Sequence, residues 1–449
     1  MSEERLVPKL RFNFEHSEFK KFKLGELVEN VVAGATPKTS VDEYWEGGDI
    51  PWLSSGEVHK KYVYFTDKFI TAEGYNNSST KLVPKNSVLI ALAGQGKTRG
   101  TVAINKIELC TNQSIASIIP NNNLYYKFLF YYLESKYDYL RALSSSDGGR
   151  GGLNLKLIRS IPIKIPSFNE QKKISDFIEL IDKKRVILEK KYGYYQDFKK
   201  YLMQQIFAQK LRFDFDDEWK QYKLKDLLTI KSSSISINQL EDNTGEYPLY
   251  GASGFLKNID FCEMETDYIS IVKDGSGVGN LSFHEKNSSI VNTSQYLLPK
   301  KEDFDIHFLY YQLQTLNLLK YVNGSSIPHI YFKDYCIEKV TVPSLPEQQQ
   351  IGKLFVDTDK TLENIDNCIR ATQEFKKGLL QQMFVYIPIF MHTILNFCVK
   401  ICCIKYFLKS KEDWYFFSSN SILLSTEVKK LAIFSCSSYD GNVIFISEN

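Results

Sequence analysis

The chain contains two copies of one sequence plan. Three short motifs each occur twice, at residues 9–12 and 210–213 (Lys-Leu-Arg-Phe), 170–171 and 347–348 (Glu-Gln), and 198–207 and 375–384 (Phe-Lys-Lys, then Gln-Gln and Phe). The second and third motifs recur at one and the same interval, which we call the repeat interval. A duplicated sequence builds the same structural unit twice, which constrains the fold more than any single motif does.

The repeat divides residues 1–384 into alternating globular and helical segments. We expect a globular domain at residues 18–167, a long helix at 168–208, a second globular domain at 215–344 and a second long helix at 345–384. Each globular segment has short β-rich runs bounded by Gly, Asn and Asp, together with one helical pattern. The predicted fold class is therefore mixed α/β (α+β), with two domains separated and followed by long helices.

Both predicted helices carry apolar side chains at alternating spacings of four and three residues. The seam comprises Ile174, Ile178, Ile181, Leu188 and Leu202 in the first helix, and Ile351, Phe355, Leu362, Ile365 and Leu379 in the second. The shared register favours mutual pairing as a coiled coil over the alternative, an amphipathic helix that covers its own domain. At roughly 1.5 Å per residue each helix would be about 58 Å long, which is typical of a spacer.

Composition narrows the functional classes. The formal net charge is only +3, so nucleic-acid binding would need local clusters of Lys and Arg. Eight Cys show neither a disulfide framework nor a metal-ligand spacing, and the N-terminal residues lack the apolar core of a signal peptide. We therefore expect an intracellular, cytoplasmic protein without a metal site.

Sequence motifs for catalysis are absent. The sequence contains no phosphate-binding G-x-x-x-x-G-K-[ST] loop, no H-E-x-x-H motif and no dinucleotide fingerprint followed by a helix. Its six His stand singly and far apart, which is typical of structural imidazoles. We predict no catalytic residues in this chain.

Two glycine-rich loops follow β-like runs at matching places in the repeats. The first offers Gln95, Lys97, Thr98 and Arg99, and the second offers Lys273 and Ser276. Glycine-rich backbone can approach a phosphate closely, and Gln or Arg side chains can read base edges. The alternative is a plain β-hairpin turn in each domain.

Further candidate DNA contacts lie after these loops and near the domain surfaces. Arg150 stands in a run of glycines, and Lys156 and Lys333 occupy matching positions in the two copies. Weaker candidates are Lys60, Lys61, Asn154 and Lys257. Cationic side chains in such places suit phosphate contacts, although a solvated loop is an equally simple explanation.

Together these residues resemble the specificity subunit of Type I restriction-modification systems. The resemblance rests on the β-like segments ending in Pro166 and Pro343, the Glu-Gln pairs after them and the long helices ending in the Phe-Lys-Lys motif. It covers residues 18–384. It implies two target recognition domains that dock in the major groove of double-stranded DNA, held apart by an antiparallel coiled coil. Because the two domains differ in sequence, the implied target is bipartite and asymmetric.

The same resemblance implies partners that supply the chemistry. Two methyltransferase (modification) subunits would grip the helices, bring S-adenosylmethionine and flip out an adenine for methylation. Restriction/translocase subunits would add ATP-dependent translocation and cleavage, with Mg²⁺. This chain would hold no cofactor of its own, and it lacks the Asn/Asp-Pro-Pro-aromatic motif of adenine methyltransferases.

The C-terminal segment departs from the resemblance. Residues 385–449 have no counterpart in the first copy and contain four of the eight Cys. Residues 385–399 carry no Lys, Arg, Asp or Glu, but this stretch is too short to span a membrane. We expect no membrane insertion and poor packing of this segment, as in a read-through extension.

Two other functions are kept as alternatives. A stand-alone DNA methyltransferase or nuclease would need the cofactor motifs that the sequence lacks. A coiled-coil adaptor without DNA binding would use the helices alone, and it would retain no DNA at any salt concentration.

Overall fold

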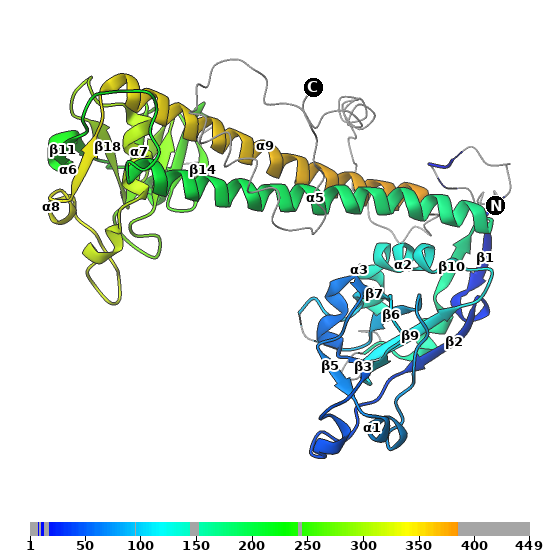
Figure 1. Ribbon diagram of the computed structural model, residues 1–449. Helices are drawn as coiled ribbons and strands as arrows, with labels where there is room; N and C mark the ends of the chain where they lie inside the picture. The colour runs from blue at the N-terminus through cyan, green and yellow to red at the C-terminus, as the bar shows by residue number, and fades with distance from the viewer. Residues whose placement is uncertain are drawn as a thin grey trace, which may run out of the picture. The chain divides into compact units, whose positions relative to one another are not determined.

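The computed structural model describes residues 8, 10–12, 18–94, 96–143, 152–240 and 245–384 (Figure 1). The chain divides into two compact units, and each combines one globular domain with half of each long helix. Among the described residues, the first unit comprises those up to Glu189 and those from Asn367, and the second comprises Lys190–Asp366. Residues 385–449, which we expected to pack poorly, lie outside the described part.

The first globular domain contains three sheets. The largest has the strand order β2–β9–β6–β7–β4, with β2 at Val28–Ala33, β9 at Ile115–Pro120, β6 at Val88–Ala91, β7 at Val102–Asn105 and β4 at Tyr62–Val63. A second has the order β5–β3–β8, with β5 at Lys68–Ile70, β3 at Ile50–Leu53 and β8 at Cys110–Thr111. The third pairs β1, Lys20–Lys23, with β10, Pro162–Ile165.

The second globular domain repeats this plan. Its main sheet has the order β12–β18–β15–β16, with β12 at Leu228–Ser232, β18 at Ser294–Pro299, β15 at Tyr268–Val272 and β16 at Leu281–His284. The smaller sheets are β14–β13–β17 and β11–β19, with β14 at Gly254–Ile259, β13 at Tyr247–Gly251, β17 at Ser289–Ile290, β11 at Lys220–Lys223 and β19 at Lys339–Val342. Corresponding strands pair with the same polarity, so the duplication extends to the topology.

Helices complete each domain. The first domain has α1 at Ala72–Asn76, α2 at Tyr126–Ser135, α3 at Tyr137–Leu143 and α4 at Leu155–Ser160, and the second has α6 at Leu224–Leu227, α7 at Ile306–Gln314 and α8 at Phe332–Tyr335. Short 3-10 turns lie at Leu24–Glu26, Asp42–Tyr44, Ser55–Lys60, Ile237–Gln239 and Leu318–Tyr321. All of the residues of β6 are buried, as expected for a strand covered on both faces.

The cores join each domain to its share of the long helices. In the first unit, Phe128 and Leu129 of α2 share a buried cluster with Ile174 and Ile178, so α2 lies between the main sheet and the helix α5 (Figure 1). In the second unit, α7 takes the same place, and Phe308 shares a cluster with Phe355. These contacts stabilise the domain and the helices as one body within each unit.

The long helices are α5, Phe168–Phe207, and α9, Leu345–Met383. In the first unit the N-terminal half of α5 packs against the C-terminal half of α9, and in the second unit the halves are exchanged, so the pairing is antiparallel. The seam is buried at Ile174, Ile178, Ile181, Leu202, Ile351, Phe355, Ile365 and Leu379, and partly buried at Leu188 and Leu362.

The mixed α/β fold class with two domains and long helices is thereby confirmed. No helix in the described ranges combines the length and apolarity needed to cross a bilayer.

Candidate functional site

The repeated Glu-Gln pair anchors the start of each long helix. Glu170 is fully buried and receives two hydrogen bonds from Arg11, from Nε at 2.7 Å and from Nη2 at 2.8 Å. In the second unit Arg212 donates to Glu347 from the same two atoms, each at 2.9 Å. A buried carboxylate needs such a bidentate partner. The arginine of each Lys-Leu-Arg-Phe motif therefore joins the segment before a domain to the long helix that follows that domain.

The neighbouring glutamine joins three backbone segments. Gln171 donates to the carbonyl oxygens of Asn123 and Pro166, at 3.0 and 3.1 Å, and accepts from the amide of Tyr125 at 2.8 Å. Gln348 repeats all three bonds, with Asp303, Pro343 and Asp305. Both side chains thus position the β segment and the loop before α2 or α7. This explains physically why the pair recurs.

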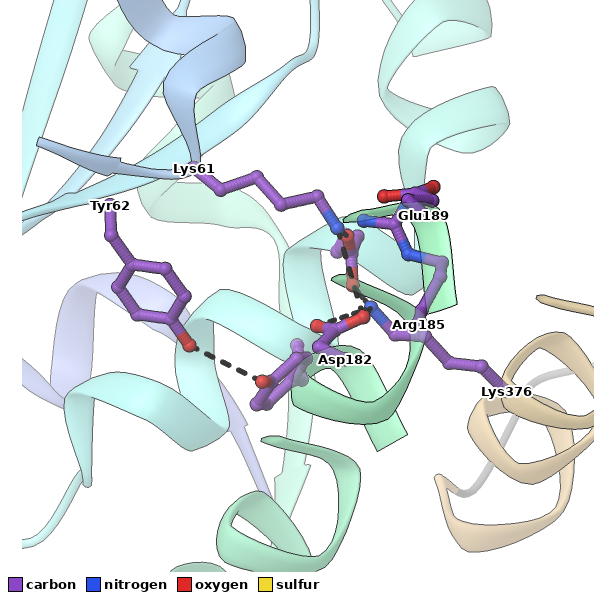
Figure 2. A network of polar contacts seen from close by, with 8 residues as sticks. Lys61, Tyr62, Asp182, Arg185, Glu189 and Lys376 are labelled. Carbon is purple, nitrogen blue, oxygen red and sulfur yellow. Dashed lines mark hydrogen bonds and ion pairs between the residues drawn. The ribbon is translucent and has the colours of Figure 1, made fainter. Parts of the chain in front are cut away.

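A polar network connects the first domain to both long helices (Figure 2). Lys376 of α9 lies 2.8 Å from both carboxylate oxygens of Asp182 on α5 and 2.7 Å from Glu134 of α2. Its ammonium also lies 5.1 Å from the ring centre of Tyr131. Because Lys376 and Asp182 are nearly buried, their charges stabilise each other in a poorly solvated place.

The second unit contains the corresponding cluster. Lys199 of α5 lies 2.6 Å from Asp359 of α9 and 5.0 Å from the ring centre of Tyr311. The Tyr311 hydroxyl donates to Asp359 at 2.7 Å, and burial followed by this bond raises the pKa of Tyr311. Asp359 and Lys376 lie one repeat interval after Asp182 and Lys199, so the duplication has preserved the contact and exchanged the helices that supply it.

Two of the candidate DNA-binding lysines belong to ion pairs. Lys61 donates to Glu134 at 2.7 Å, and Lys60 donates to Glu57 and Asp67 at 2.8 and 2.9 Å. Burial favours a lower pKa for Lys61, but the charges of Glu134 and Asp182 outweigh it and raise that pKa. The Lys61 charge is thus used to hold the first domain on the helices, which argues against a phosphate contact at this position.

The glycine-rich loops connect adjacent antiparallel strands. Residues 92–101 join β6 to β7, and residues 273–280 join β15 to β16. Gly96 and Gly275 have φ angles of +61° and +94°, which residues with a Cβ seldom adopt. Both loops are therefore hairpin connections, as the simpler alternative predicted, and they occupy equivalent positions in the two domains.

Each hairpin loop is joined to the second candidate stretch of its domain. The amide of Leu153 donates to the carbonyl of Leu92 at 3.0 Å, and the amide of Ile330 donates to that of Lys273 at 2.9 Å. Stretches that are distant in sequence are thus brought together twice, at matching places. We take this pair of loops as the candidate nucleic-acid interface of each domain.

The remaining candidates are placed as follows. Lys97, Lys156, Ser276 and Lys333 are exposed, Thr98, Arg99, Lys257 and Lys273 are half-buried, and Gln95 and Arg150 lie outside the described residues. Asn154 is exposed, but its side-chain oxygen caps α4 by accepting from the amide of Leu157 at 2.9 Å. Lys156 and Lys333 lie on the short helices α4 and α8, which follow the second stretch in each domain.

Sequence reasoning missed the apolar side chains at this interface. In the second domain Ile327 and Tyr331 are 68% and 44% exposed in the stretch that contacts the glycine-rich loop. The signal available was an isoleucine within a Gly-Ser-Ser-Ile-Pro turn, where apolar residues are uncommon.

Within the described residues, no group of three or more His, Cys, Asp or Glu could hold a metal ion. Ser270 and His284 form a hydrogen bond at 2.9 Å. This pair is buried, and burial lowers the pKa of His284 to about 4. A nucleophile has to reach its substrate, so this pair is structural.

The duplicated domains, the antiparallel helices and the paired loops define a two-domain recognition protein. The chain belongs to the family of the Type I restriction modification DNA specificity domain, whose model matches residues 16–192 and 216–371. Members of this family are DNA-recognition subunits without catalytic chemistry of their own.

Individual relatives agree with this assignment. The chain is 24% identical over 428 residues to the Type I restriction enzyme MjaIX specificity subunit of Methanocaldococcus jannaschii, a match that covers 83% of this chain and 97% of the relative. It is 28% identical over 209 residues to the EcoR124I/EcoR124II specificity subunit of Escherichia coli, where the match spans about half of the relative, 52%, and 42% of this chain. The crystal structure of the S subunit from M. genitalium has the same fold, with a TM-score of 0.59 at 19% identity, covering 85% of this chain and all of that one.

Proposed function

We propose that this chain recognises a bipartite, asymmetric DNA sequence and directs adenine methylation and restriction by partner subunits. The observation that carries the proposal is the pair of joined loops, which occurs once in each domain at equivalent positions. Exposed lysines lie in these stretches or shortly after them in sequence, with Lys97 and Lys156 in the first domain and Lys333 in the second. Lysines around a loop pair of this kind suit phosphate contacts that orient a base-reading loop.

The antiparallel helices would set the distance between the two half-sites. Each unit contains one clamp in which a lysine of one helix binds an aspartate of the other and a tyrosine of the domain. A clamp of this kind fixes each domain to the long helices. Each domain would therefore have a defined position along the helices. Half-site spacing then becomes a geometric property of the protein.

Methyltransferase subunits, two by the resemblance, would dock on the long helices. Helix α5 exposes Leu180, Val186 and Ile187 within the first unit, with Ile187 being 65% exposed. In the described part of α9 no large hydrophobic side chain is exposed, and the position equivalent to Ile187 is Asn364. Leu180 and Ile187 are two helical turns apart and so lie on one face of α5, and neighbouring exposed apolar side chains suit a binding surface.

The cofactors would stay with the partners. S-adenosylmethionine would be bound by the methyltransferase subunits, and ATP and Mg²⁺ by the restriction subunits. This chain would contribute DNA recognition and assembly.

The test is co-expression with the methyltransferase genes, followed by purification and mapping of methylated adenines. We expect methylation at one bipartite sequence, and we expect exchange of residues 215–343 for those of a relative to change one half-site only. Purified chain alone should transfer no methyl group from labelled S-adenosylmethionine, which separates the proposal from a stand-alone enzyme. Salt-sensitive retention of DNA by the complex separates it from an adaptor.

A matched pair of variants tests the docking surface. Ile187→Lys should weaken co-purification of the methyltransferase, whereas Asn364→Lys, at the equivalent position of α9, should leave it unchanged. Equal effects of the two substitutions would contradict docking on the apolar face of α5.

A further inference from the structure

An apolar tip projects beside the glycine-rich loop of the second domain. Ile327 is 68% exposed. It lies in a turn that is closed by reciprocal backbone hydrogen bonds between Asn323 and His329, at 2.9 and 2.8 Å. The amide of Gly275 donates to the carbonyl of Pro328 at 2.9 Å and so fixes the turn against the loop. A β-branched side chain on a fixed turn has little freedom to withdraw from solvent.

The turn that carries Ile327 depends on a glycine. Gly324 has a φ of +88°, and a Cβ added there would lie 2.6 Å from the carbonyl oxygen of Ile327. Any other residue would therefore strain the turn. The glycine at this position therefore helps to fix the turn on which Ile327 is exposed.

Polar and cationic groups neighbour the tip in sequence and along the loop that contacts it. The ring of His329 lies 5.0 Å from that of Tyr331, and Lys333 Nζ lies 5.3 Å from the Tyr331 ring centre. Ser326 is exposed and precedes Ile327 in the sequence. Ser276 is exposed in the glycine-rich loop that contacts the turn. An exposed isoleucine and tyrosine among hydroxyls and a lysine are a smaller and more polar surface than a protein-docking patch, which is a contiguous apolar area. Such a surface fits a groove in which phosphates flank one apolar group.

We propose that Ile327 contacts the C5-methyl group of a thymine in the half-site bound by the second domain. This inference rests on the proposed function. In the major groove the thymine methyl is the apolar feature that distinguishes bases, and aliphatic side chains recognise it by contact. The corresponding stretch of the first domain carries Arg150, which suits guanine. Different residues at the matching position of the two copies agree with an asymmetric target.

The experiment uses the full chain in complex with its methyltransferase subunits. The target is first mapped from methylated adenines. Duplexes are then made in which each thymine is replaced, one at a time, by deoxyuridine, which lacks only the methyl group. Burial of one methyl is worth about 0.8 kcal/mol, or roughly fourfold in affinity. One replacement in the second half-site should weaken wild-type binding by about that factor.

Variants assign the effect to the residue. Ile327→Ala should weaken binding to the thymine duplex by a few-fold and should respond no further to the critical deoxyuridine. Ile337→Ala removes an isoleucine outside the turn that is 57% exposed, and this variant should keep the wild-type response. Gly324→Ala should displace the tip and mimic Ile327→Ala while the domain stays folded.

The outcomes are distinct. Wild-type affinity that is insensitive to every deoxyuridine would overturn the inference, even if Ile327→Ala weakens binding, since that pattern indicates a wedge between base steps. An Ile327→Ala protein that keeps the deoxyuridine response would overturn it as well. A complex that methylates no sequence and retains no duplex would instead overturn the proposed function.

Discussion

Lys376 on α9 and Asp182 on α5 face each other with both carboxylate oxygens 2.8 Å from the ammonium nitrogen. Both side chains are about nine-tenths buried, and the contact joins residues 194 positions apart in sequence. A long-range pair of buried charges is costly unless both partners are present. Substitution of either partner therefore tests whether the two helices are paired in the first unit.

Removing one partner of this pair should destabilise the first unit strongly. Lys376→Met should lower the free energy of unfolding by about 3 kcal/mol, because Asp182 and Glu134 lose the ammonium group that they share and only Lys61 stays close to them. The double variant with Asp182→Asn should lose less than the sum of the single losses. Urea unfolding read by pulse proteolysis measures each value, and Lys377→Met, at the exposed neighbouring position, is the control. Additive losses would contradict the pairing.

The corresponding pair in the second unit should matter less. Asp359 is 38% exposed at its side chain, so solvent screens its attraction to Lys199. Lys199→Met should cost about 1 kcal/mol, roughly the value of a well-formed exposed pair. The same proteolysis assay, read on peptides of the second unit, compares it with Lys200→Met, which removes an exposed lysine. A cost equal to that of Lys376→Met would show that exposure does not govern the difference.

The glutamine that joins three backbone segments should be essential for local stability. Gln171→Leu leaves two carbonyl groups and one amide without their partner, and unsatisfied buried groups cost about 1–3 kcal/mol each. We expect a loss of at least about 2 kcal/mol, together with faster amide exchange at Tyr125. Gln204→Leu, at an exposed position of α5, should change stability by less than about 0.5 kcal/mol.

Stability of the second domain should depend on pH through His284. Burial lowers the pKa of this imidazole to about 4, whereas an unfolded chain has about 6.5, so the unfolded state binds more protons between these values. The contribution of neutral His284 to the free energy of unfolding is therefore fully present above pH 6.5. About 3 kcal/mol of it is lost as the pH drops to 4.

A substitution isolates this contribution. His284→Phe keeps a ring between Tyr250 and Tyr268 but cannot take up a proton, so its stability should change less between pH 7 and 5. Urea unfolding at both pH values, read within residues 245–343, measures the difference. His59→Gln, at an exposed imidazole of the other unit, should retain the wild-type slope.

The sequence predicted the long helices and the duplicated plan because both depend on local periodicity and on repetition. It could not predict the order of strands, since pairing such as that of β2 with β9 joins segments that are distant in sequence. It also offered Lys61 as a candidate DNA contact, because nothing local reveals Glu134 as its partner, at a sequence separation of 73. The capping role of Asn154 was accessible, as an Asn before a helical run commonly caps it. The assignment of individual DNA contacts stays a prediction.

The segments that Arg11 and Arg212 join to the long helices make one more matching contact. The amide of Leu10 donates to the carbonyl of Gln382 at the end of α9, as the amide of Leu211 donates to that of Gln205 at the end of α5. The segment near the start of the chain thus occupies, in the first unit, the place that the continuing chain occupies in the second. A peptide link from the end of α9 to Leu10 would therefore repeat, in the first unit, the connection that the chain makes after α5 in the second. A circular permutant that joins Met383 to Leu10 and opens after Phe207 would keep every contact described for the two clamps.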